Sequence, residues 1–214
     1  MVEHILAALA GLQLDNVEVW VDAAEMPGLD GSSQPLIEAL DAAGAVTQEA
    51  PRQRLVIERP VRIGDERAWV EATPAADEGL TLSFVIDYGP GNPIGRQSLE
   101  RTLSPRTFRE ELATSRTFLL EEEARWLQAQ GLGSRVGSRD LLIFNDQGPI
   151  DNPLRFADEC VRHKMLDLCG DLALAGCDIA GHVRAYCSGH HLNADLVRTL
   201  VGRDEQLPRQ RRSA

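Results

Sequence analysis

One segment limits the possible folds of this chain more than any other: residues 152–176, NPLRFADECVRHKMLDLCGDLALAG. Its length and apolar spacing predict a long helix, and Gly176 is a typical stop signal. Between Asp158 and Asp171 the segment also carries a histidine, a lysine and several acids, interleaved with apolar residues. A helix that only packed a core would not need so many ionisable groups close to apolar ones. We therefore ask which chemistry this helix carries.

The spacing of His163 and Asp167 indicates a metal site. They are four residues apart, so both side chains project from one helix face and can converge on one ion. An imidazole nitrogen and a carboxylate oxygen are ligands for Zn²⁺ at ~2.0–2.2 Å, and a third ligand would leave one tetrahedral position for water. Asp171 lies one further turn along this face and can orient an imidazole from elsewhere. The alternative is a solvated helix face with an i, i+4 pair.

Other histidines strengthen the metal hypothesis. The chain has only five, and His4 follows Glu3 at the start of another predicted helix, so that one residue can ligate while its neighbour acts as a base. His190 follows a glycine at a strand-to-helix junction, a place where loops carry function. His182 has the pattern of a strand-surface residue. Glu3 alone could equally be an acid that interacts with the helix dipole.

Composition excludes several classes of protein. The net charge of −11 over 214 residues argues against general nucleic-acid binding. No apolar run approaches the ~20 residues of a transmembrane helix, so we expect no membrane anchor. The N-terminus is a poor secretory signal. The cysteines form no Cys-x-x-Cys pair, and we expect buried, reduced thiols in a cytoplasmic protein. They are Cys160, Cys169, Cys177 and Cys187.

Hydrophobic periodicity and turn residues predict the elements of an α+β fold. Residues 1–50 are expected to form a helix, a half-buried strand and a second helix: 2–12, 16–23 and 34–46. The remainder is expected to form strands at 54–63, 67–75, 80–88, 140–144 and 178–189. Its expected helices are 104–133, with an interruption near 115–117, then 152–176 and 190–202.

The predicted elements change from mainly helices to mainly strands near the polar segment 48–54, which indicates a domain boundary there. Residues 1–50 have too few strands for an independent sheet, and a lone strand at 16–23 leaves its ladder groups unpaired. Either the partner of this strand is missing from the chain, which makes 1–50 an incomplete first domain, or the second α+β domain, 51–205, supplies it. The tail 206–214 is polar and expected to be disordered.

Several motifs occur in an order that points to one family. They are VEHILAALAGLQLDNVEV, EMPGLDGSSQP, SRTFLLEEEARWLQAQGL, DNPLRFADECVRHKMLDLCGDLALAG and AYCSGHHLNADLV. Together they resemble the bacterial UDP-3-O-acyl-N-acetylglucosamine deacetylase, a zinc amidase that commits the lipid A pathway, up to about residue 203. The resemblance implies two similar β-α-α-β domains, each a layer of helices on a sheet. It also implies release of acetate from UDP-3-O-acyl-N-acetylglucosamine by water, in the cytoplasm of a Gram-negative type of bacterium. We expect a monomer.

The resemblance assigns the metal ligands and the base residue by residue. It implies that His4, His163 and Asp167 hold Zn²⁺, with a water on the open position. Glu3 would take a proton from that water as the general base. Without the resemblance, Glu3 could be only an acid that interacts with the helix dipole, and His163 and Asp167 only an i, i+4 pair on a solvated helix face.

The resemblance also implies the substrate-facing residues. His190 would be the general acid or charged partner of the amide, with Asp171 hydrogen-bonded behind it. Lys164 would lie near the reacting acetyl group, Thr117 would donate to the oxyanion, and Phe118 would contact the acyl chain. Lys164 could instead be a solvated helix residue, Thr117 a hydroxyl at a helix break, and Phe118 a core residue.

The sequence departs from the family pattern in two places. The family has a further stretch of its first domain before VEH, and Met1 stands where it usually has a threonine. The loop YGPGNPIGRQ also varies. A metal ligand near a fraying terminus is poorly held, so we expect weak zinc binding and little activity. The alternative function is a silent fragment that folds and binds a nucleotide-sugar or a partner. A zinc peptidase is disfavoured, because no His-Glu-x-x-His occurs.

Overall fold

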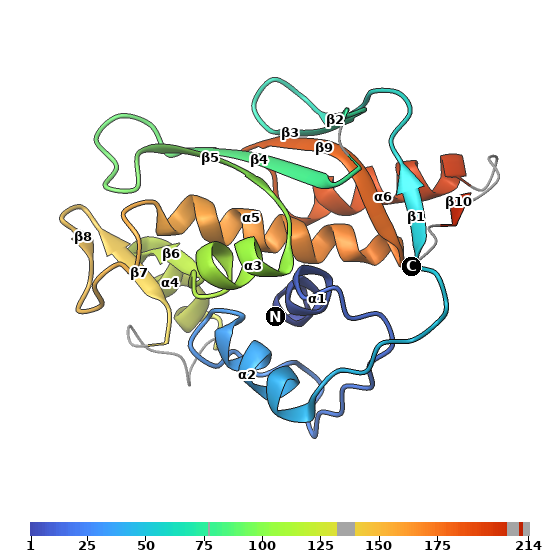
Figure 1. Cartoon of the computed structure of the whole chain (residues 1–214). Coiled ribbons are helices and arrows are strands. Elements are labelled where there is room, and N and C mark those ends of the chain that lie inside the picture. Colours follow the sequence, from blue (N-terminus) through green and yellow to red (C-terminus); the bar gives the residue numbers. More distant parts are fainter. Residues whose placement is uncertain (77, 132–139, 205–209, 212–214) are drawn as a thin grey trace.

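A sheet covered on one face by helices forms the centre of the molecule (Figure 1). The computed structural model describes residues 1–76, 78–131, 140–204 and 210–211. Within these residues, helices α5 (Glu159–Leu172) and α6 (His190–Asp204) lie under the sheet. Helix α1 (Val2–Gly11) packs against α5, and α2 (Gln34–Ala43) lies on the far side of α1 from the sheet. The α+β class expected from the sequence is confirmed.

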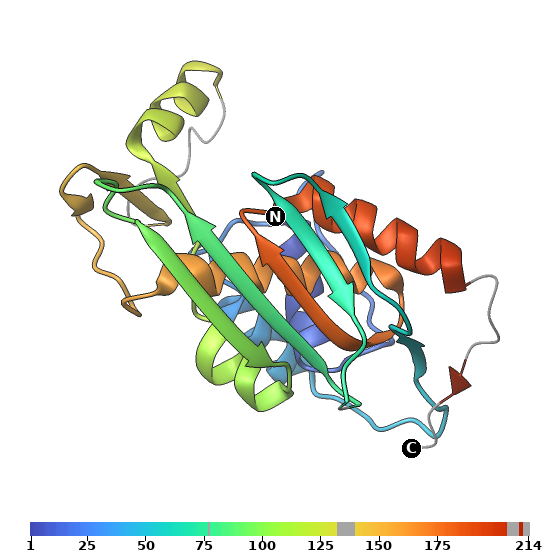
Figure 2. The same ribbon diagram turned by 90° about the horizontal axis from the view of Figure 1, so that it is seen from above.

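The described residues form one sheet of seven strands and one of three. The large sheet is built from β1 (Gln53–Val56), β2 (Val61–Gly64), β3 (Trp69–Thr73), β4 (Leu80–Asp87), β5 (Arg96–Thr102), β9 (Asp178–Tyr186) and β10 (Gln210–Arg211). Strand β9 is central: it pairs parallel with β4 and antiparallel with β3, and its first residues pair parallel with β1 (Figure 2). The three-stranded sheet consists of β6 (Phe118–Leu120), β7 (Leu142–Asn145) and β8 (Gly148–Pro149).

Alternation along β4 explains why the helices cover one face of the sheet. Leu82, Phe84 and Ile86 are buried, while the residues between them are only partly buried. Because side chains on a strand alternate between faces, these three share the face that contacts α5. Met165 and Leu168 of α5 are fully buried as well. The apolar residues of the long helix therefore form the core, as its periodicity predicts.

The structure divides two of the predicted elements into shorter ones. Residues 54–63 form two strands, β1 and β2, because Pro60 cannot donate to a ladder and the chain changes its pairing partner there. The predicted helix 104–133 is short: α3 (Pro105–Thr107) leads into a π-helical turn (Phe108–Leu112). Strand β6 follows, and only then helix α4 (Glu121–Ala129). Residues 132–139 of this prediction lie outside the described residues.

The prediction of a half-buried strand at 16–23 is wrong. This segment has no strand pairing, and Trp20 is 88% exposed. The described residues place no strand beside it, so its backbone has no ladder to join. In the tail, β10 pairs with β1, although disorder was expected there; the other residues of 206–214 lie outside the described part.

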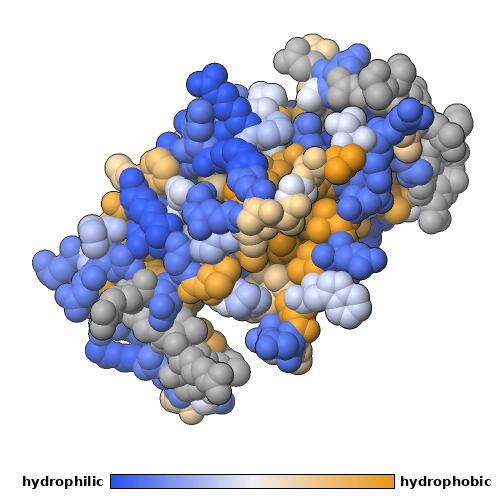
Figure 3. Space-filling model, turned by 60° about the horizontal axis from the view of Figure 1, so that its bottom comes forward, coloured by the Kyte–Doolittle hydropathy of each residue, from blue (hydrophilic) through white to orange (hydrophobic). Residues whose placement is uncertain are grey.

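Apolar side chains gather on the face opposite the large sheet (Figure 3). Among the described residues, most of the exposed large hydrophobic side chains come from the first 46 positions. These are Met1, Val2, Val17, Val19, Trp20, Val21, Leu29 and Val46. None of the described helices has the length and apolar character that a membrane span requires.

Candidate metal centre

Helices α1 and α5 build the site because they cross in close contact. His4 lies in the first turn of α1, and its backbone carbonyl accepts a hydrogen bond from the buried Ser33 hydroxyl at 2.9 Å. On α5, Gly170 faces this turn, and a Cβ atom there would overlap the carbonyl oxygen of Glu3. Glycine is unfavourable inside a helix, so this position serves the close approach of the two backbones.

Three buried side chains converge where the helices cross. They are His4, His163 and Asp167, whose ligand atoms all lie within 4.8 Å of one another. The Asp167 Oδ1 atom is 3.7 Å from His4 Nε2 and 3.4 Å from His163 Nε2. Two ligands of a tetrahedral ion with bonds of ~2.0–2.2 Å lie roughly 3.3–3.6 Å apart. The donor set and its spacing therefore fit one Zn²⁺-sized ion.

The second ring nitrogen of His163 is held by the backbone. His163 Nδ1 lies 3.1 Å from the carbonyl oxygen of Ser115, which can only accept a hydrogen bond. The proton is therefore assigned to Nδ1, and Nε2 keeps a free lone pair toward Asp167. Burial lowers the pKa of His163 to about 4, although Asp167 opposes the shift. The imidazole is neutral at pH 7, which is the ligating form.

Asp167 is held as a carboxylate. Burial alone would raise its pKa, but His163, Lys164 and the neighbouring His4 bring the pKa below its ordinary value. Lys164 Nζ donates to Asp167 Oδ2 at 2.8 Å. This contact engages one carboxylate oxygen and leaves the other directed at the two histidines.

His190 forms a second polar group with Asp171. His190 Nδ1 lies 2.9 Å from Asp171 Oδ2, and Asn193 Nδ2 donates to the same oxygen at 2.7 Å. Ser188 in turn donates its hydroxyl to Asn193 Oδ1 at 2.9 Å. The hydrogen bond that His190 donates to Asp171 raises the pKa of His190, against partial burial. This arrangement stabilises an imidazolium that is half exposed, so it can meet a ligand.

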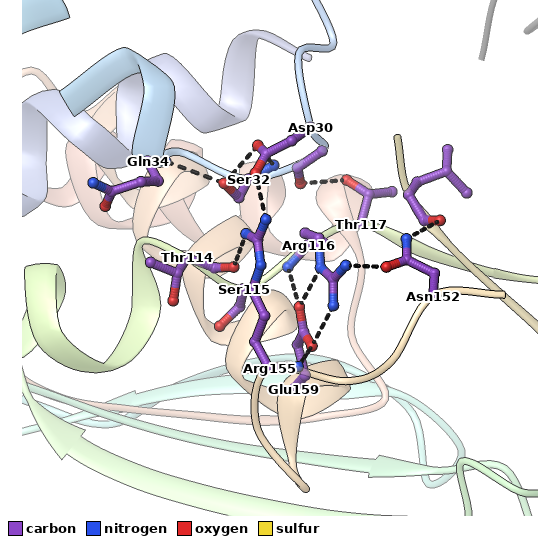
Figure 4. Close-up of polar contacts among 12 residues, drawn as sticks. Asp30, Ser32, Gln34, Thr114, Ser115, Arg116, Thr117, Asn152, Arg155 and Glu159 are labelled. Atoms are coloured by element: carbon purple, nitrogen blue, oxygen red, sulfur yellow. Dashed lines mark hydrogen bonds and ion pairs between the residues drawn. The ribbon is translucent and has the colours of Figure 1, made fainter. Parts of the chain in front are cut away.

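The other predicted residues surround these two groups. The Glu3 carboxylate is 3.2 Å from the ammonium group of Met1; burial raises its pKa, but the hydrogen bond to its own backbone and this ammonium outweigh burial and lower it. The Thr117 hydroxyl donates to the carbonyl oxygen of Gly31 at 3.1 Å (Figure 4). The Phe118 ring meets the His163 ring edge-on, with centroids 6.2 Å apart.

Comparisons with known proteins agree on one family. The sequence profile of LpxC, UDP-3-O-acyl N-acetylglycosamine deacetylase, matches residues 1–202. The chain belongs to this deacetylase family. A UDP-3-O-acyl-N-acetylglucosamine deacetylase of Thermosynechococcus vestitus is 43% identical over 94% of this chain and 68% of its own length. Namesakes from Oleidesulfovibrio alaskensis and Photobacterium profundum are 39% and 40% identical over 95% of this chain.

The matches to the Oleidesulfovibrio and Photobacterium proteins cover 66% and 67% of the lengths of those two proteins. The chain therefore spans about two thirds of the length of these relatives. The family consists of deacetylases, which are hydrolases that act on an amide, in agreement with the resemblance seen in the sequence. The name of each relative states a UDP-3-O-acyl-N-acetylglucosamine substrate for that relative.

The structure brings most of the predicted residues of this deacetylase family member into one region. His4, His163 and Asp167 meet, with Lys164 on Asp167. His182, predicted to be a strand-surface residue, lies away from them on β9, where its Nε2 atom is 2.6 Å from the Ser83 hydroxyl. Whether these residues act as the resemblance implies remains a prediction.

Sequence reasoning missed three supporting residues. Ser115 supplies the carbonyl under His163, Asn193 shares Asp171 with His190, and Glu159 is completely buried at the start of α5. The helical spacing of two of them could have been noticed in the sequence. Asn193 stands three residues after His190, and Glu159 stands four residues before His163, so each lies on the same helix face as its histidine. Ser115 contributes a backbone atom, which no residue type reveals.

The four cysteines lie outside the candidate metal centre. Cys160, Cys169 and Cys187 are free thiols, as expected, and Cys160 and Cys169 are buried. Cys177 and Cys187 are only partly buried, which corrects the expectation for these two. Burial raises the pKa of Cys160 and of Cys169 to about 12. Both are therefore neutral and function as small apolar residues.

Proposed function

We propose that this chain hydrolyses the N-acetyl amide of UDP-3-O-acyl-N-acetylglucosamine and releases acetate, with Zn²⁺ held by His4, His163 and Asp167. The observation that carries the proposal is the buried convergence of these three ligand atoms in a member of this deacetylase family. Two imidazoles and one carboxylate are a typical catalytic zinc set with one position left open. The tautomer and pKa of His163 support its role as a ligand.

When bound, Zn²⁺ supplies a Lewis acid and lowers the pKa of a water to ~7. The protein residues then move the protons. Glu3 accepts a proton from the attacking water, and its lowered pKa keeps it in the carboxylate form that a base requires. His190, protonated through Asp171, donates a proton to the amide nitrogen, which is otherwise a poor leaving group.

Two further residues act on the reacting acetyl group in this proposal. Lys164 holds Asp167 and brings a positive charge close to the place where the amide oxygen gains negative charge. Thr117 donates to the same oxygen after its hydroxyl rotates away from Gly31. Loss of one such donor costs ~3–4 kcal/mol of transition-state stabilisation in other enzymes.

The acyl chain is assigned to the aromatic side of the site. Phe118 contacts Tyr88 and Phe144 with ring centroids 6.0 and 6.4 Å apart, and its ring also meets His163. This cluster offers an apolar wall next to the metal ligands. We further propose action as a monomer in the cytoplasm, because all three ligands come from one chain and Cys160, Cys169 and Cys187 are free thiols.

Acetate release measured on the zinc-loaded chain tests this proposal. His4 is buried and its backbone carbonyl is held by Ser33, so we now expect firm zinc binding where the sequence suggested weak binding. The unaltered chain is therefore expected to release acetate from UDP-3-O-acyl-N-acetylglucosamine. His190→Ala should keep its zinc and lose about 10²–10⁴-fold in kcat, because a positioned proton donor contributes that much. His163→Ala should lose both zinc and activity.

The matched control is His182→Ala, which removes a histidine on β9 bonded to Ser83. It should keep wild-type activity and zinc content. A zinc-loaded, folded chain that releases no acetate would rule out the proposed activity and favour a binding role. Loss of zinc in the His182 variant would instead indicate a different ligand set.

A further inference from the structure

A buried ion pair lies next to the metal centre and has no part in the chemistry proposed above. The Arg116 side chain is 5% exposed, and the Glu159 side chain is fully buried. Glu159 is the first residue of α5, one helical turn before His163, and Arg116 lies in the loop that leads into β6. An ion pair with this burial is a weak source of stability, since desolvation offsets much of its attraction. Its placement therefore needs another explanation.

Glu159 is the hub of this network (Figure 4). Its Oε1 atom accepts from the Arg116 backbone N–H at 3.0 Å and from Nε at 2.8 Å. Its Oε2 atom accepts from the Arg116 guanidinium at 3.1 Å and from the Arg155 backbone N–H at 2.6 Å. The guanidinium also donates to Asn152 Oδ1 through Nη1 and to the carbonyl oxygen of Pro153 through Nη2. Each oxygen of Glu159 is thus held by two donors.

One peptide unit links this hub to the metal centre. The N–H of Arg116 donates to Glu159, and the C=O of Ser115 accepts from His163 Nδ1. These two groups are the opposite sides of a single Ser115–Arg116 peptide, which is planar and rigid. When Glu159 fixes the direction of the N–H, it also fixes the direction of the C=O that faces the His163 ring.

We propose that Glu159 is a positioning residue: through the Ser115–Arg116 peptide it selects the Nδ1–H tautomer of His163 and aims Nε2 at the metal. This inference rests on the proposed zinc site. The two residues Glu159 and His163 share one face of α5, so the helix and the peptide close a small ring of contacts. Groups that orient a ligating histidine are typically worth 10–100-fold in metal affinity.

Other contacts keep the loop in place without Glu159. Arg155 donates to the carbonyl oxygen of Thr114 at 2.7 Å and to Asp30 at 2.8 Å. On the other side, the backbone N–H of Thr117 donates to Gly31 at 2.8 Å. Removing the carboxylate should therefore turn the peptide rather than detach the segment. A variant at Glu159 can therefore lose the peptide orientation while the loop stays in place, which distinguishes a positioning role from a general loss of structure.

The test is the tautomer of His163, read from its ring ¹⁵N shifts in the metal-free chain at about pH 8, where an ordinary histidine is neutral. The unaltered chain should show the Nδ1–H form alone. Glu159→Leu, which removes the acceptor and nearly keeps the volume, should show a mixture of tautomers. Glu159→Gln, which keeps one acceptor oxygen, should lie between the two.

Zinc affinity, measured by competition with a chelator, is the second readout. It should fall about 10–100-fold in Glu159→Leu and less in Glu159→Gln. Glu71→Gln is the matched control, because Glu71 forms an ion pair with Arg184 on the large sheet. This control should leave both the tautomer and the affinity unchanged. A pure Nδ1–H tautomer together with unchanged affinity in both Glu159 variants would overturn the proposal.

A measurement on the unaltered chain covers the case in which the variants do not fold. The backbone amide of Arg116 should exchange with solvent as slowly as the amides inside α5. Exchange at the rate of an exposed loop would overturn the proposal, because the N–H would not be held by Glu159. The tautomer and the exchange rate need no bound zinc, so they stand apart from the test of the proposed function.

Discussion

At the scale of single residues, Asp171 determines the charge of His190. Its carboxylate accepts hydrogen bonds from both His190 and Asn193, and the bond from Asn193 fixes the orientation of the carboxylate. The pKa of His190 is raised above the ordinary value of ~6.5. A histidine whose folded pKa is raised stabilises the protein below the unfolded pKa, and this contribution is lost as the pH rises through the folded pKa.

Asp171→Asn tests this assignment. The change removes the charge that favours the imidazolium, so the pKa of His190 should fall, and the stability that it adds near pH 6 should decrease. An NMR titration of the His190 ring protons measures the pKa directly. The control is Asp195→Asn, an exposed change on α6, the helix of His190, and it should leave the His190 titration unchanged. An unshifted His190 titration in Asp171→Asn would show that another group holds the proton.

The residue types of the site were partly readable from the sequence. The pair His163 and Asp167 followed from helical spacing alone, because both sides of the pair lie in one element. His4 was a candidate ligand from its residue type, but its assignment to the same ion came from the family resemblance, since its partners lie far away along the chain. The carbonyl of Ser115 was not predictable, because the loop conformation that presents it depends on Glu159 and Arg116.

At the scale of elements, the crossing of α1 and α5 places the ligands. Gly170 lies beside the backbone of Glu3, and Ala7 N would be 3.1 Å from a Cβ atom at this position. A larger residue must push α1 away from α5 and would carry Glu3 and His4 with it. The metal centre therefore depends on a glycine that bears no functional group.

Gly170→Ala should destabilise the chain by about 1–3 kcal/mol, the usual cost of overpacking. Helix propensity alone would predict a gain of about 0.5–1 kcal/mol, so the sign of the change is informative. Zinc affinity should fall as well. Gly202→Ala is the control: it lies in α6 with open space around it and should be neutral or slightly stabilising. Denaturant unfolding and zinc titration of both variants measure the effects, and an unimpaired Gly170→Ala would contradict this account.

Element prediction succeeded where local pattern and final structure agree. The helix that carries His163 and the strands β3, β4 and β9 were expected from periodicity. Phe118–Leu120 was assigned to a helix because its sequence continues a helical pattern into Glu121. In the structure this segment pairs in parallel with Leu142–Asn145, and such a non-local ladder leaves no local signal. Tertiary pairing outweighed propensity there.

At the scale of the whole molecule, the site joins segments from the beginning, the middle and the end of the chain. His4 lies on α1, His163 and Asp167 lie on α5, and His190 begins α6. The helices that carry them are layered under one sheet with β9 at its centre (Figure 1). The architecture was predicted as a class, but the failure at 16–23 shows that alternation alone does not make a strand without a partner.

The most direct test of the central claim is the zinc stoichiometry of the chain, combined with X-ray absorption at the zinc edge. We expect one zinc per chain, bound by two imidazole nitrogens and one carboxylate oxygen at ~2.0–2.2 Å. His4→Ala, His163→Ala and Asp167→Ala should each lose the ion, while His182→Ala should retain it. A chain that binds no zinc, or that keeps the same zinc spectrum after loss of any of the three ligands, would contradict the account.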